Sequence, residues 1–185
     1  QAGDAVARKK DGDLLALFSS LNGGVDLGSA GRDLELGNLL VLIGESKANN
    51  YPKPVHIVHH PYATMHVAAS TFGYAGSGTM GTGAGAALAS DLANDMLKNF
   101  FEFRIGDISV YQDGNITLDG SDDGVGAIFS EAAMCYTESV GFNQETERDA
   151  SLRATELVVT CDYGVFELDD SYGAKATFNC KATTD

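Results

Sequence analysis

Four histidines lie within eleven residues, at His56, His59, His60 and His66, and this is where the residue types best suit a metal site. Zinc takes three or four ligands that converge on one point, and histidine is a common one. Side chains of an extended strand alternate between its two faces, so His56 and His60 are expected on one face and His59 on the other. We therefore predict a structural or interface role for these histidines, with no metal ligand and no bound cofactor.

Two other stretches match the letters of ligand-binding motifs. Gly76–Gly81 has the glycine spacing of a dinucleotide-binding fingerprint, but it follows no strand, lacks a βαβ frame and is not followed by the lysine of a phosphate-binding loop. Asp119–Gly124 concentrates oxygen ligands suited to calcium, although Leu118 stands where an EF-hand loop requires glycine. We interpret the first as part of a flexible loop, Phe72–Gly85, and the second as an acidic turn. No catalytic residue is predicted.

The composition bounds the classes of function. The chain has 185 residues, 44% of them hydrophobic, enough for one compact unit or two small lobes. A formal net charge of −14 argues against tight binding to nucleic-acid phosphates, because that affinity comes mainly from lysine and arginine. No apolar run is long enough to span a bilayer. The sequence therefore predicts a soluble protein without a membrane partner.

Three cysteines, Cys135, Cys161 and Cys180, are widely spaced and form no Cys-x-x-Cys pair for zinc or redox chemistry. Free thiols in a reducing compartment are the expectation. A single disulfide between Cys161 and Cys180 remains open.

The first third of the chain is expected to contain three helices and one strand. An amphipathic helix at Asp4–Leu21 should end at Asn22–Gly24, since asparagine and glycine adopt the left-handed conformation that closes helices. A second helix is expected at Asp33–Lys47, with Asp33 as its N-cap. Two prolines then break the helical pattern, and a buried strand at Val55–His59 and a helix at Tyr62–Ser70 follow.

The rest of the chain is expected to be richer in strands. In chain order, the expected elements are a helix at Ala86–Phe101, a strand at Arg104–Tyr111, a turn at Asp113-Gly114 into a strand at Ile116–Leu118, a strand at Val125–Phe129, a helix at Ala132–Ser139, and strands at Thr155–Leu168 and Ala174–Phe178. The strand at Thr155–Leu168 is too long to pair wholly within a small domain, so part of it should pair with neighbouring elements or copies. On it, Val159 is expected to face a core together with Leu157 and Cys161.

Several of these features follow one another in a characteristic order. The C-terminal part contains the strand Val125–Phe129, then Ser-Glu-Ala-Ala, the segment Glu147-Arg148 and the strand Tyr163–Val165. This order resembles that of tailed-phage major capsid proteins, which share the fold first seen in phage Hong Kong ninety-seven. The run DGDLLALFSSLNGG is similar to the end of the long spine helix of that family. The proline loop, apolar strand, His-Pro step and helix, together with the segment RIGDISVY, resemble the axial lobe of the family.

The resemblance implies an α+β fold with two lobes: an axial lobe with a mixed sheet flanked by helices, and a peripheral lobe with the spine helix and long β-strands. Residues 1–32 would be the end of the spine helix, residues 33–149 the axial lobe, and residues 150–185 the long strands of the peripheral lobe that return to the axial lobe. Family members usually carry an arm and an extended hairpin before the spine helix. Nothing before Asp4 supplies either, so the encoding gene is expected to extend upstream of Gln1.

The resemblance also implies a function. The chain would be a structural shell protein, not an enzyme, that self-assembles into hexameric and pentameric capsomers of an icosahedral phage head enclosing double-stranded DNA. Its partners would be other copies of itself and scaffold, portal and decoration proteins, with assembly in the host cytoplasm and a final location in the virion. The alternative is an acidic soluble enzyme or ligand-binding domain that uses the His56–His66 segment, with the Gly76–Gly85 loop as a lid.

Overall fold

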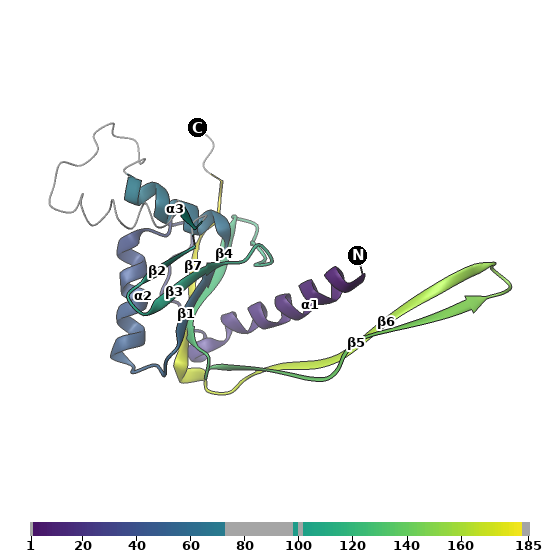
Figure 1. Cartoon of the computed structure of the whole chain (residues 1–185). Helices are drawn as coiled ribbons and strands as arrows, with labels where there is room; N and C mark the ends of the chain where they lie inside the picture. Colours follow the sequence, from purple (N-terminus) through teal and green to yellow (C-terminus); the bar gives the residue numbers. More distant parts are fainter. Residues whose placement is uncertain (1, 73–97, 100–101, 183–185) are drawn as a thin grey trace.

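The chain folds into a sheet domain with a long arm attached at one side (Figure 1). The computed structural model describes residues 2–72, 98–99 and 102–182. The expected loop at Phe72–Gly85, including Gly76–Gly81, and the expected helix at Ala86–Phe101 lie almost wholly outside the described residues.

Five strands form the sheet of the domain, in the order β2-β3-β1-β4-β7. Their bounds are β1 Val55–His59, β2 Phe103–Ile105, β3 Ile108–Gln112, β4 Asp123–Ser130 and β7 Gly173–Asn179. Because β1 runs parallel to β3 and antiparallel to β4, the sheet is mixed. The strand expected at Val55–His59 is confirmed, and the strands expected at Val125–Phe129 and Ala174–Phe178 lie within β4 and β7.

Two helices, α2 (Leu36–Ala48) and α3 (Pro61–Phe72), pack against one face of this sheet. Buried side chains of both helices form a single apolar cluster with side chains of β1, β3, β4 and β7. In β1 burial alternates along the strand, with Val55 and Ile57 turned into this cluster. The helix expected at Tyr62–Ser70 is confirmed within α3.

The N-terminal helix is shorter than the sequence indicates. The α-helix α1 covers Ala2–Ala16 and is followed by two short 3-10 turns, η1 (Leu17–Ser19) and η2 (Leu21–Gly24). The expected closure at Asn22–Gly24 is confirmed, since Asn22 and Gly23 have φ values of 53° and 59°. The expected helix at Asp4–Leu21 is therefore α-helical only as far as Ala16.

The turns η1 and η2 pack against the opposite face of the sheet. Phe18 and Leu21 are buried there against Ala127 of β4 and against Ala133. The sheet is thus covered on both faces near β4, which explains why that strand is buried along most of its length.

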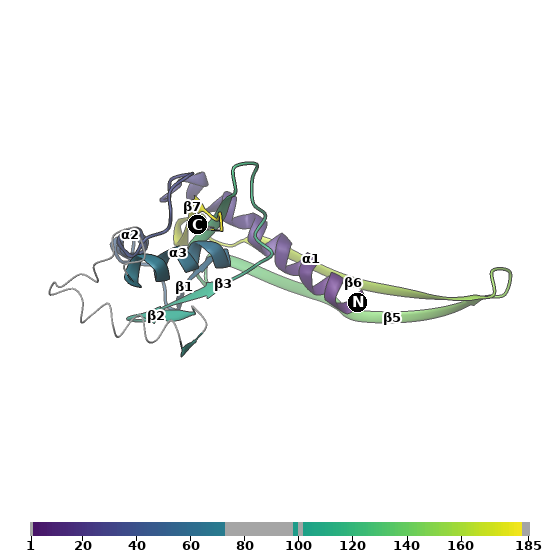
Figure 2. The same ribbon diagram turned by 90° about the horizontal axis from the view of Figure 1, so that it is seen from above.

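The arm is a hairpin of two long antiparallel strands, β5 (Met134–Asp149) and β6 (Ala154–Glu167), which form a separate sheet. Figures 1 and 2 show the arm projecting from the sheet domain, with α1 beside the half nearer the domain. The strand expected at Thr155–Leu168 is confirmed as β6. The helix expected at Ala132–Ser139 is wrong, because its aromatic and β-branched residues begin β5 and pair with β6.

Two other expected strands are wrong. The segment Arg104–Tyr111 contains parts of two strands rather than one, because Gly106 takes a φ of 63° and turns the chain back between β2 and β3. The segment Ile116–Leu118 forms no strand, and only Leu118 makes a single bridge, to Gly124. Turn residues alone did not determine whether the flanking residues pair.

Asp33 is not the N-cap of α2. The helix begins at Leu36, and the capping position is held by Glu35, whose side chain makes no capping hydrogen bond. The Asp33 carboxylate instead accepts a hydrogen bond from Nδ2 of Asn179 at 2.7 Å, which joins the start of this segment to the end of β7. The short turn η3 (Asp170–Tyr172) leads into β7 at the base of the arm.

Candidate assembly surface

The arm is held to α1 by a cluster of five polar and aromatic side chains, here called the anchor cluster. Nζ of Lys10 donates to Oε1 of Glu138 at 2.9 Å and lies over the rings of Tyr136 and Tyr163, at 5.8 and 5.5 Å from their centroids. The Tyr163 hydroxyl donates to Oδ2 of Asp13 at 2.7 Å. The ammonium group of Lys10 thus contacts both strands of the arm, through one charge-assisted hydrogen bond and two cation–π contacts.

The electrostatics of the anchor cluster favour the charged forms of its acid and its base. The hydrogen bond to Glu138 raises the pKa of Lys10 above its ordinary value, and hydrogen bonds from Tyr136 and Lys10 lower the pKa of Glu138. The hydrogen bond to Asp13 raises the pKa of Tyr163 to about 12, so that its hydroxyl remains a donor. All three pKa shifts favour the protonation states that make the hydrogen bonds of the anchor cluster.

The anchor cluster was not predicted from the sequence. Lys10 and Glu138 are 128 residues apart, and no local pattern joins them. One signal in the sequence was available: Tyr136 and Glu138 are two residues apart, so on a strand their side chains would share one face.

The two sides of the arm differ in charge beyond the reach of α1. On the side that continues from Tyr163, the cross-strand pairs are Gln144 with Val159, Thr146 with Leu157 and Arg148 with Thr155. On the other side, the pairs are Glu145 with Val158, Glu147 with Glu156 and Asp149 with Ala154. Because paired residues share a side, the first side has no carboxylate in this part of the arm and the second has four.

Large apolar side chains of the arm are exposed, at Tyr136, Val140, Phe142, Leu152, Leu157, Val158 and Phe166. Val159 is only half-buried and Leu157 is 51% exposed, so the expectation that Val159 faces a core with Leu157 and Cys161 is wrong. The physical reason is that, within the described parts of the chain, α1 covers only the half of this two-stranded ribbon nearer the domain (Figure 2). An isolated two-stranded sheet is only marginally stable in water, so this ribbon is suited to being covered by a partner.

The four histidines do not converge. His56 and His59 lie on opposite faces of β1, as expected, and His60 lies beyond the strand at the start of α3. Nε2 of His56 is 3.4 Å from Oε1 of Glu131. His66 is buried in α3, where its Nε2 lies 3.0 Å from the carbonyl oxygen of Lys181. His56 and His66 thus contact different groups, the Glu131 carboxylate and the Lys181 carbonyl oxygen, and share no partner.

His59 is the most enclosed of the four. Its Nε2 contacts the carbonyl oxygen of Ala176 at 3.2 Å, and its Nδ1 accepts a hydrogen bond from the backbone N–H of His60 at 2.8 Å. Burial lowers the pKa of His59 to about 4. These partners match a neutral imidazole with the proton on Nε2, which joins β1 to β7.

The carboxylates of Asp119 and Asp123 in the acidic turn accept hydrogen bonds from backbone N–H groups. Oδ1 of Asp119 accepts from the N–H groups of Ser121 and Asp123, at 2.8 and 2.9 Å. Oδ1 of Asp123 accepts from the N–H of Gly31 at 2.8 Å. These bonds order the turn and fasten it to the segment before α2.

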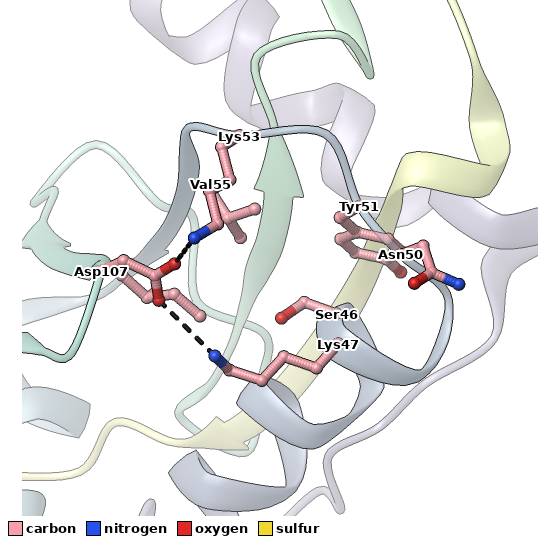
Figure 3. Close-up of a pocket in the computed structure, with 8 residues that line it drawn as sticks. Ser46, Lys47, Asn50, Tyr51, Lys53, Val55 and Asp107 are labelled. Atoms are coloured by element: carbon pink, nitrogen blue, oxygen red, sulfur yellow. Dashed lines mark ion pairs between the residues drawn. The ribbon is translucent and has the colours of Figure 1, made fainter.

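A pocket of about 210 Å³ lies between the end of α2 and the β2–β3 turn (Figure 3). Asp107 stands between two lysines there and forms ion pairs with both Lys47, at 3.6 Å, and Lys53. The hydrogen bond from Lys53 lowers the pKa of Asp107. The charged groups of the pocket already pair with one another. We therefore interpret these ion pairs as contacts that hold the β2–β3 turn against α2.

Among the described residues, no group of three or more histidine, cysteine or carboxylate side chains could hold a metal ion. No helix in the described parts of the chain is long and apolar enough to cross a membrane. The expectation of free thiols is confirmed, because Cys135, Cys161 and Cys180 are all unpaired. The disulfide left open between Cys161 and Cys180 does not form: Cys161 belongs to the arm, and Cys180 is buried in the sheet domain.

Solved structures with a similar fold include phage capsid and encapsulin structures. A structure of Mycobacterium phage Che8 matches with a TM-score of 0.63 and 16% identity, over 94% of this chain and 60% of that one. The capsid structure of cyanophage P-SCSP1u matches with a TM-score of 0.59 and 12% identity, over 97% and 64%. The holo-SrpI encapsulin complex from Synechococcus elongatus matches with a TM-score of 0.62 and 9% identity, over 100% and 65%.

The chain thus spans about two thirds or less of the length of these similar structures. No family model matches the sequence, and no curated protein is similar enough to count as a relative. The fold inferred from the sequence is therefore confirmed by structure rather than by sequence similarity. The described chain has the α+β fold first seen in the capsid protein of phage Hong Kong ninety-seven.

Proposed function

We propose that this chain is a structural, non-enzymatic shell protein that self-assembles into hexameric and pentameric capsomers of an icosahedral phage head. The observation that carries the proposal is the arm: a long ribbon with exposed apolar side chains, projecting from a domain that has the fold of capsid and encapsulin structures. Among the described residues, the ribbon packs against α1 and, at its base, through Met134 against the apolar cluster around Phe18 and Leu21. Neighbouring copies would bury the apolar side chains that remain.

The two lobes expected from the sequence are also part of the proposal. The five-stranded sheet with α2 and α3 would be the axial lobe, near the centre of a capsomer, and α1 with the arm would be the peripheral lobe. The expected boundary at residue 149 falls between two strands that pair along their length, so we take both strands into the peripheral lobe. β7, from the C-terminal segment, returns to the axial sheet.

The proposed head encloses double-stranded DNA without binding it specifically. A net charge of −14 supports this, because like charge discourages adhesion of the genome to the wall. Scaffold, portal and decoration proteins would be further partners, the site of assembly would be the host cytoplasm, and the final location would be the virion.

Sedimentation velocity tests the proposal. The protein is expected to sediment as capsomers or particles far larger than one 19.4 kDa chain. Nuclease treatment of the particles should leave protected double-stranded DNA, which separates a phage head from a shell that encloses protein. A stable monomer at high concentration would contradict the proposal.

A further inference from the structure

The outer face of α2 carries no charge from residue 37 to residue 44, where it is formed by Gly37, Leu40, Val41 and Gly44, and the exposed Lys47 follows on the same side. All four residues are exposed, and Leu40 and Val41 keep 53% and 58% of their surface accessible. Their spacing of three and four residues places them on one side of the helix. The buried residues of α2, among them Leu39, Leu42 and Ile43, lie on the side that packs against the sheet.

The exposed side chains of Leu40 and Val41 are unusual on the solvent side of a helix, because 21% of the residues in this chain are charged and such residues normally occupy that side. A solvated helix face normally carries lysine, arginine, glutamate or aspartate. α2 has its nearest charges at Glu45 and Lys47, and Lys47 pairs with Asp107 at the C-terminal end of the helix. The outer face thus has the residue types of a buried helix face, although no residue that the structure describes covers it.

Gly44 is a second, independent indication. It lies in the interior of α2, where glycine destabilises the helix relative to alanine. An added Cβ at Gly44 would meet no atom within 4 Å, so no contact among the described residues requires glycine there. The same holds for Gly37 in the first turn. Glycine at an exposed helix position allows another backbone to approach closely.

From these observations we infer that the outer face of α2 docks against a second copy of this chain. The inference rests on the proposed function. The net charge of the chain supports this choice of partner. Copies that each carry a net charge of −14 repel one another, so contacts between copies are favoured on surfaces without carboxylates, such as the outer face of α2. Figures 1 and 2 place α2 at the end of the molecule opposite to the arm. Each copy would then meet neighbours at both ends, as a closed shell requires.

Gly44→Ala is the sharpest test, because folding and assembly should change in opposite directions. The unassembled variant should melt about 2 °C higher, since alanine favours the helix and meets no atom. The protein concentration at which half of the chains are assembled, measured by sedimentation velocity, should rise about tenfold, because the added methyl group keeps the partner's backbone from approaching closely. A variant that is more stable and assembles like the wild type would overturn the inference.

Leu40→Glu provides a second readout. It should raise the concentration for half-assembly by more than about a hundredfold, since a carboxylate would be buried at the contact. The matched control is Val25→Glu, which introduces the same charge at an apolar residue of similar exposure, 51%, away from α2. Equal losses in both variants would show a general effect of charge and overturn the inference.

Two remaining outcomes are distinguishable. A lower melting temperature of unassembled Leu40→Glu would mean that the face is covered within its own chain, and would overturn the inference alone. A wild-type chain that stays monomeric would overturn the proposed function together with the inference.

Discussion

The imidazole of His59 reaches from β1 across Gly126 of β4 to the carbonyl oxygen of Ala176 in β7, with 3.2 Å between Nε2 and that oxygen. The glycine makes this possible, because a Cβ at position 126 would lie 2.2 Å from Cδ2 of His59. Three adjacent strands are therefore tied by one buried side chain.

Acid should destabilise the fold through His59. Its pKa is about 4 in the folded chain, below the ordinary value of 6.5, so its contribution to stability is fully present above pH 6.5 and is lost as the pH falls toward 4. Between pH 7 and pH 4.5 the loss should be roughly 2 kcal/mol in the free energy of unfolding, measured by urea denaturation. His59→Gln should be less stable near pH 7 but should lose less on acidification. An unchanged loss in that variant would show that other groups cause the acid sensitivity.

Gly126→Ala should be strongly destabilising. The added methyl group would meet the His59 ring and, at 2.6 Å, the carbonyl oxygen of Val58, neither of which can move without disturbing β1. We expect a cost of about 3 kcal/mol or more in the free energy of unfolding. Gly12→Ala is the control: in α1 an added Cβ meets nothing within 4 Å, and a gain of about 0.5–1 kcal/mol is expected. Similar stabilities for the two variants would refute the packing described at Gly126.

Lys10→Ala should loosen the arm. Removing the ammonium group takes away the bond to Glu138 and the contacts with Tyr136 and Tyr163. Hydrogen exchange of the amides in β5 and β6 should become faster, while exchange in the five-stranded sheet stays the same. Arg8→Ala is the control, because Arg8 is exposed and pairs within α1, with Asp4. Equal exchange in the two variants would show that the anchor cluster does not restrain the arm.

Chelation should leave the thermal stability and the assembly of the protein unchanged. His59 and His66 each have a ring nitrogen facing a backbone carbonyl oxygen, of Ala176 and Lys181, and the four histidines do not converge. Treatment with EDTA, followed by thermal unfolding and sedimentation, checks this. Stoichiometric metal in elemental analysis, lost together with stability, would contradict it.

The sequence predicted most elements of the sheet domain, because apolar alternation and turn residues act locally. The sequence pattern predicts strands at Val55–His59 and Val125–Phe129, and both segments form strands. The start of β5 was mistaken for a helix, since Ala132, Ala133 and Met134 favour helices and only pairing with β6 overrides that preference.

The burial of the arm could not be predicted in the same way. Alternation along β6 indicates that Leu157 and Val159 share a side, but it does not say whether anything covers that side. The anchor cluster depends on contacts between α1 and strands far along the chain, and no window of the sequence contains both.

Electron cryo-microscopy of the assembled protein tests the central claim most directly. We expect closed icosahedral shells in which the five-stranded sheets surround the fivefold and sixfold positions and the arms lie at the periphery against neighbouring copies. Small oligomers without shells, or shells in which the arms contact no other copy, would contradict it.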